Sequence, residues 1–159
     1  MKIYRLKRFS LVTEQVREEY ITVPGDISNL PEIVQRYYKV GLNKDFLELI
    51  NLQGCHEYNP FPVPIIDDKV DKEGLSPIFA ENQDSGDMGS FSIYHKDGEL
   101  YKRSGIFFKK FSPMSNLEFK NFLLNSIEED RVGQEWVSHP NGRKIIALEE
   151  KIKSKIEKL

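Results

Sequence analysis

The sequence predicts an α+β fold: a single domain in which a mainly antiparallel sheet packs against helices, with an amphipathic helix at the C-terminus. Short runs of β-branched and aromatic residues, bounded by Gly, Pro and Asp, indicate strands. Apolar residues that recur three and four positions apart indicate helices. The chain has 159 residues, of which 39% are hydrophobic and 30% charged, so it is long enough for one domain with its own core.

Strands are predicted in several separate stretches. Residues 1–23 are rich in β-branched and aromatic side chains and are expected to be extended. Phe61–Ile66 contains prolines, which suit the edge of a sheet. Ile78–Ala80 is expected to be a short buried strand. The pair Asp97-Gly98 predicts a tight hairpin, because both central positions of such a turn need a positive φ. A further strand is expected within residues 105–111.

Helices are predicted from their end signals and apolar faces. Asn29 is expected to cap a helix that stops at Gly41, and Asn43 to cap a second helix that ends near Leu52. Ser115 and Glu118 form a capping box, which predicts a helix behind them. The apolar face of that helix is predicted to consist of Leu117, Phe119, Phe122, Leu123 and Ile127.

The C-terminal segment, residues 143–159, has the pattern of an amphipathic helix. Its apolar stripe is made of Ile145, Leu148, Ile152, Ile156 and Leu159, and Lys and Glu occupy the other positions. Residues 131–142 contain glycine and proline and are predicted to link this helix to a body formed by residues 1–130. The stripe is expected to dock on the domain or on a partner.

Composition excludes several classes of protein. The formal net charge is −2, with 23 basic and 25 acidic residues, which gives no case for direct nucleic-acid binding. The one cysteine, Cys55, allows no internal disulfide and fits a reducing compartment. No apolar stretch resembles a signal peptide or is long enough to span a bilayer. The sequence therefore predicts a cytoplasmic location.

Two groups of acidic residues were considered as sites. Glu81, Asp84 and Asp87 lie three residues apart, whereas calcium loops place oxygen ligands two apart and close with a glutamate. Asp67 and Asp68 are adjacent and, in an extended chain, point in opposite directions. We therefore predict surface carboxylates here and no metal site.

Cysteine and histidine give no clear catalytic pattern either. Cys55 and His56 are neighbours, but a thiol and its base are normally brought together from distant positions. His95 and His139 are possible distant bases that no motif singles out. Phosphate-binding loops, dinucleotide fingerprints and nucleophile elbows are absent from the sequence. No catalytic residue and no cofactor is predicted, and the chain is not expected to be an enzyme.

Three segments resemble the SUKH superfamily, which comprises bacterial toxin-immunity proteins related to yeast regulators of glucan synthesis. They are GLNKDFLELINLQG (Gly41–Gly54), SPIFAENQDSGDMGSFSIYHKDGELYK (Ser76–Lys102) and SNLEFKNFLLNSI (Ser115–Ile127). The likeness spans roughly residues 30–128. It departs from the family pattern at Asn43, where proline is usual, and in the acidic loop, which has Gly86 and Gly89 but no glycine run.

This resemblance implies a function in protein binding. Similar family members bind and block a secreted toxin, often a nuclease. The acidic loop would then connect two strands of an antiparallel sheet and would not be catalytic. An acidic surface attracts a basic toxin and occludes its cleft. The expected contact residues are Asp67, Asp68, Glu81, Asp84 and Asp87.

Two other functions remain open at this point. The chain could be a regulatory scaffold that binds an endogenous partner through the helix at residues 143–159. It could also be a small enzyme whose site is assembled from scattered polar residues, for which a pocket with perturbed histidines or carboxylates would be the sign.

Overall fold

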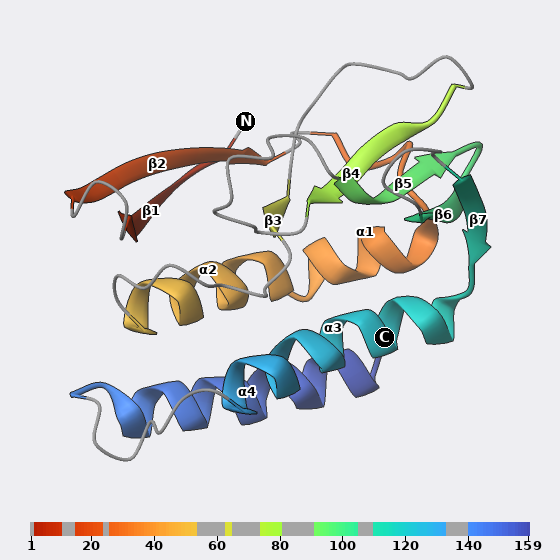
Figure 1. Cartoon of the computed structure of the whole chain (residues 1–159). Helices are drawn as coiled ribbons and strands as arrows, with labels where there is room; N and C mark the ends of the chain where they lie inside the picture. The colour runs from red at the N-terminus through yellow and green to blue at the C-terminus, as the bar shows by residue number, and fades with distance from the viewer. Residues whose placement is uncertain are drawn as a thin grey trace.

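The computed structural model describes residues 2–10, 15–23, 26–53, 63–64, 74–80, 91–104, 110–132 and 140–159. These residues form a compact α+β unit, as predicted, with the helices on one side of the larger sheet (Figure 1). The helices are α1 (Glu32–Lys39), α2 (Leu42–Gln53), α3 (Asn116–Val132) and α4 (Gly142–Glu157). The strands are β1 (Lys2–Ser10), β2 (Gln15–Val23), β3 (Val63–Pro64), β4 (Ser76–Ala80), β5 (Phe91–Lys96), β6 (Glu99–Ser104) and β7 (Lys110–Met114).

The larger sheet has the order β3-β4-β5-β6-β7, and every neighbouring pair is antiparallel. The predicted hairpin joins β5 and β6, with Asp97 at φ 51° and Gly98 at φ 77°. The edge strand predicted near Phe61–Ile66 is the short strand β3. The strand predicted within residues 105–111 overlaps β7 at its end, and residues 105–109 lie outside the described residues. Strand β7 includes Pro113, and a residue without an N–H fits it because this strand forms an edge of the sheet.

The first two strands form a separate antiparallel hairpin, in register from Lys2 opposite Val23 to Ser10 opposite Gln15. The extended conformation expected for this part of the chain is confirmed. Strand β2 begins earlier than the apolar run at Tyr20, because pairing with β1 continues over the charged residues that precede it. The hairpin approaches α2 through β1 and β3 through β2.

The start of α1 corrects one prediction. Asn29 does not cap the helix: the position before the first helical residue is Pro31, and no side chain caps it. The Oδ1 atom of Asp26 instead accepts a hydrogen bond from the Ser28 N–H at 2.9 Å, which forms a turn of its own. The Gln35 side chain donates to the Leu30 carbonyl at 2.8 Å and holds this turn against the helix. Local bonds of this kind compete with capping.

The junction between α1 and α2 is nearly as predicted. Gly41 has φ 80°, the left-handed conformation that ends many helices. The second helix starts directly after it at Leu42, so Asn43 is not its cap but a buried residue of its first turn. Two tight helices in succession leave no room for a separate capping residue.

The predicted capping box of α3 is confirmed. The Glu118 N–H donates to the Ser115 Oγ at 3.1 Å, and the Ser115 N–H donates to the Glu118 Oε1 at 3.3 Å. Phe119, Leu123 and Ile127 are fully buried, as expected from their spacing. The prediction for Leu117 is wrong: it is 67% exposed, because it lies two residues before Phe119 and therefore on the opposite side of the helix.

One core joins the sheet to the helices. Tyr37 of α1 has its ring centroid 5.2 Å from that of Phe79 and 6.3 Å from that of Phe119, so strand β4 and helices α1 and α3 meet there. Burial without a hydrogen bond to its hydroxyl group raises the pKa of Tyr37 well above its usual value. Tyr37 is therefore a residue of the core.

Helix α4 is part of this core. Its stripe is buried against α2 and α3, and the buried members are Ile145, Leu148, Ile152 and Ile156. At the start of α4, the Asn141 side chain donates to the Leu52 carbonyl of α2 at 3.0 Å. The segment therefore docks on the domain, which is one of the two outcomes expected from its sequence.

A charged contact holds the other end of α4. The carboxylate of Asp45 on α2 is only 7% exposed and lies 2.6 Å from the ammonium of Lys155 and 3.5 Å from that of Lys151. The same Lys155 ammonium donates to the Val40 carbonyl at 2.7 Å. Because Val40 is the residue directly after the end of α1, one lysine ties α4 to both α1 and α2.

Candidate functional site

The acidic residues predicted as partner contacts, Asp67, Asp68, Glu81, Asp84 and Asp87, lie outside the residues that the structure describes. The same holds for Cys55, His56 and His139. The strands on either side of residues 81–90 are described, and they are antiparallel neighbours with Ala80 opposite Phe91. The predicted connection between two strands of an antiparallel sheet is therefore confirmed.

The face of the sheet that points away from the helices carries an aromatic surface, which we call the aromatic face. Tyr94 of β5 is only 5% exposed. It meets the half-buried ring of Phe111 of β7 edge to face, with ring centroids 4.9 Å apart, across the intervening strand β6. Tyr101 and Arg103 of β6 are half-buried on the same face, and Pro113 of β7 is exposed. Four different side-chain types thus share one surface on three paired strands.

Strand alternation explains why these side chains share a face. Successive residues of a strand point to opposite sides. Ile93 and Leu100 point into the core, so Tyr94 and Tyr101, which follow them, point the other way and lie directly opposite one another. Lys102 points to the helices, where its ammonium lies 2.5 Å from the Glu118 carboxylate of α3. The aromatic face is therefore fixed by the same pairing that builds the core.

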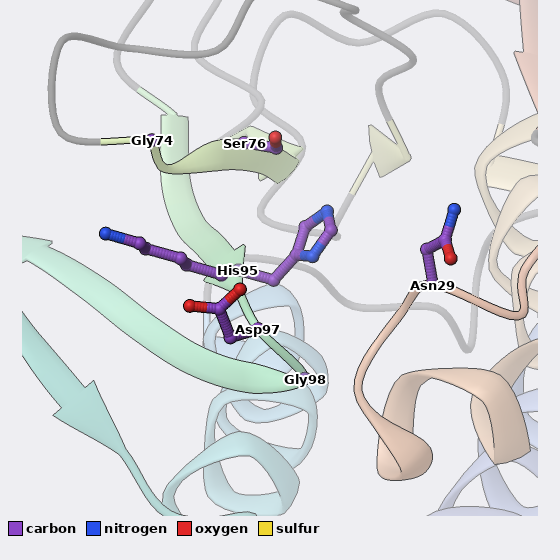
Figure 2. A pocket seen from close by; sticks show the side chains of 7 residues that line it. Asn29, Gly74, Ser76, His95, Asp97 and Gly98 are labelled. Carbon is purple, nitrogen blue, oxygen red and sulfur yellow. The ribbon is translucent and has the colours of Figure 1, made fainter.

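A second feature is a polar hollow of about 350 Å³ at the end of the sheet (Figure 2). Three segments far apart in the sequence meet there: the chain before α1, the start of β4 and the turn between β5 and β6. The lining residues are Asn29, Gly74, Ser76, His95, Lys96, Asp97 and Gly98. All of them are polar, charged or glycine.

The geometry of the hollow follows from the sheet. Ser76 and His95 are paired across β4 and β5, so their side chains start from neighbouring positions on one face. In Figure 2 the His95 ring extends toward Asn29, while the Asp97 carboxylate lies on the other side of the ring. Gly74, at φ 82°, leaves space for Lys96, whose Nζ lies 3.6 Å from the place where a Cβ would be.

Burial controls the charge of His95. Desolvation lowers the pKa of the His95 ring below its usual value, so the ring is mainly neutral at pH 7. A neutral imidazole donates one hydrogen bond and accepts another. Among the described residues, the structure shows no hydrogen bond from the side chains of Asn29, Ser76 or His95 to a neighbour, so these polar groups face the hollow.

Sequence reasoning did not find this hollow. His95 was considered as a distant base, and the Asp97-Gly98 turn was predicted, but nothing in the sequence places Asn29 or Ser76 beside them. Within the described ranges, no group of three His, Cys, Asp or Glu side chains could hold a metal ion. None of the helices described there is both long and apolar enough to cross a membrane.

Comparison with known proteins gives no relative: no protein-family model, no curated protein and no solved structure matches the chain. The aromatic face, the polar hollow and the resemblance in the sequence are therefore the features that bear on function.

Proposed function

We propose that the chain is a non-enzymatic protein-binding domain that acts in the cytoplasm and neutralises a toxin by covering its active site. The observation that carries the protein-binding part is the aromatic face. Tyr, Phe and Arg are enriched in protein interfaces. The aromatic rings bury large areas with few rotatable bonds, and the planar guanidinium of Arg donates several hydrogen bonds. The toxin as partner rests on the resemblance to immunity proteins.

The construction of the aromatic face supports binding without large rearrangement. Its side chains stand on three strands held by continuous antiparallel pairing, and the opposite side of these strands is anchored in the core by Ile93 and Leu100. A surface fixed in this way loses little conformational entropy when a partner docks. Rigid docking suits an inhibitor that must fill a cleft.

The acidic residues give the proposal its electrostatic part. Asp67, Asp68, Glu81, Asp84 and Asp87 are the proposed contacts to a basic toxin. Charges at the rim of an interface mainly raise the rate of association, and salt weakens their effect. Binding of the proposed partner should therefore be tighter at low salt.

The alternative function, a regulatory scaffold, would need a free surface on α4. Its docking element was the apolar stripe of α4, and the stripe is buried inside the chain. A partner that used this stripe would have to pull α4 off the domain. The aromatic face offers contact area without that cost.

The first experiment is a pull-down of the tagged full chain from its native cells at low and high salt, followed by mass spectrometry. A salt-sensitive partner with a basic toxin-like domain, whose activity falls when the purified chain is added in equal amount, is the expected result. A housekeeping or cell-envelope partner that is not inhibited would contradict the immunity function.

Variants then locate the interface. Tyr101→Ala should weaken the purified complex by at least tenfold, because hot-spot tyrosines typically contribute about 2 kcal/mol or more. Leu117→Ala is the control: it also removes a large side chain, one that is 67% exposed, but on the helix side of the molecule. Charge reversal at Asp67, Asp68 and Glu81 should mainly slow association and flatten its salt dependence. Unchanged binding by the Tyr101 variant would remove the aromatic face from the interface.

A further inference from the structure

The polar hollow is open to solvent and is large enough to hold a small group. Its volume of about 350 Å³ is at the lower end of the range typical of ligand pockets. Its walls come from three segments that the fold holds independently: the turn before α1, the β4–β5 pairing and the tight β5–β6 turn. A cleft with such walls keeps its shape when it is empty.

Three neutral side chains in the hollow can donate hydrogen bonds to one group. They are the Asn29 amide, the Ser76 hydroxyl and the His95 imidazole, and Figure 2 shows the imidazole between the other two. The Asp97 carboxylate is turned to the far side of the ring. Donors from three directions, with no apolar wall among the lining residues, fit an oxygen-rich group and do not fit an apolar one.

The charged side chains around His95 are of both signs. Lys96 and Asp97 line the hollow with it, Glu99 stands opposite Lys96 across the hairpin, and the segments that bear Asn29 and Ser76 contribute no charged side chain to the lining. Burial alone lowers the pKa of His95. An anion placed against the ring would offset that desolvation by favouring the protonated form.

We propose that this hollow binds a carboxylate group, which accepts hydrogen bonds from Asn29, Ser76 and His95, with the Lys96 ammonium at the rim. The carboxylate belongs either to a free small acid or to an Asp or Glu side chain of a protein. The inference does not depend on the toxin-binding function: a free acid can occupy the hollow whether or not the aromatic face binds a partner.

Because His95 can take up a proton when the carboxylate binds, the proposal predicts that the affinity depends on pH. The carboxylate binds best to protonated His95, so binding takes up a proton. Above the pKa of free His95, affinity should therefore fall by up to tenfold for each unit that the pH rises. A carboxylate that touched only surface lysines would show no such dependence between pH 6 and 8.

The test is an NMR titration of the full chain with acetate, succinate and a capped tripeptide that contains glutamate, at pH 6, 7 and 8. The expected result is a shift of the His95 ring signals, a higher pKa of His95 in the bound state and binding that weakens as the pH rises. Preference for succinate indicates a free acid, and preference for the peptide indicates a protein side chain. Either preference supports the proposal.

Variants make the assignment specific. His95→Gln should abolish the pH dependence, and Ser76→Ala should weaken binding several-fold. Asp97→Asn keeps a residue that tolerates the left-handed turn and should leave binding equal or tighter, because it removes a neighbouring negative charge. Far-UV circular dichroism checks that each variant is folded. Two results would show that the proposal is wrong. The first is that folded wild-type protein shows no shift of the His95 signals at a probe concentration of about 50 mM, which sets the weakest affinity of interest. The second is that His95→Gln binds the probe with the same pH dependence as the wild type.

Discussion

Replacing Ile152 by alanine measures how far α4 belongs to the core. Ile152 is 0% exposed and belongs to the same buried cluster as Phe46 and Leu49 of α2. Truncating a buried isoleucine to alanine costs about 2–5 kcal/mol, from lost burial and from the cavity left behind. A domain of this kind is stable by about 5–15 kcal/mol in total. One substitution should therefore remove a large part of the stability.

Equilibrium unfolding in urea, followed by far-UV circular dichroism, provides the free energy of unfolding. The matched control is Ile146→Ala, which makes the same chemical change on the same helix at a side chain that is 42% exposed. The control should change stability by less than about 1 kcal/mol, since little buried area is lost. Equal and small losses for the two variants would refute the packing of α4 described above.

Deletion of residues 143–159 extends the same reasoning. It removes four buried apolar side chains, Ile145, Leu148, Ile152 and Ile156. At about 1.5–3 kcal/mol for each, the lost burial amounts to roughly 6–12 kcal/mol, which equals the stability of a typical domain. The shortened chain should be unfolded, and a cooperative unfolding transition in it would show that α4 is only an appendage.

Three further outcomes are expected. Asp45→Asn should lower stability by about 1–3 kcal/mol, because the buried oxygen loses its charge beside Lys155, and a value near zero by urea unfolding would contradict the role of this contact. The hydrogen bond from Lys102, and then that from the Ser115 N–H, lower the pKa of Glu118. The contribution of Glu118 to stability is therefore complete above the usual glutamate pKa of about 4.3 and is lost as the pH falls through the lower, folded-state pKa. Glu118→Gln should reduce the loss of stability in acid. An unchanged dependence of stability on pH would exclude this role of Glu118. Gly98→Ala should cost about 1–2 kcal/mol although no atom lies within 4 Å of the new methyl group, because φ is 77°, and an unchanged melting temperature would contradict that origin.

Features that depend on a few adjacent residues were predictable from the sequence. The Asp97-Gly98 turn and the Ser115–Glu118 capping box were both expected, and both are present. Each works through backbone conformation or hydrogen bonds within four residues, so the rest of the fold cannot easily change it. The stripe of α4 was predictable for a related reason, since helical spacing alone places Ile145 and Ile152 on one face.

Features that depend on neighbours far along the chain were predicted less well. Asn29 has the right chemistry for a helix cap, but the Asp26 turn and the Gln35 side chain fix the backbone differently. The local signal at Asn29 was real, and packing with the rest of the domain decided the outcome.

The hollow shows the same limit for function. Ser76 and His95 become neighbours only through the antiparallel pairing of β4 and β5, and Asn29 joins them only because its turn ends beside that pair. Sequence motifs work when the chemistry needs residues close together in the chain, as in a phosphate-binding loop. A site made of single residues from three segments leaves no such motif. The turn before α1 prevents Asn29 from capping the helix, and the same turn brings Asn29 to the hollow. The wrong prediction for the start of α1 and the failure to predict the site therefore have one structural cause.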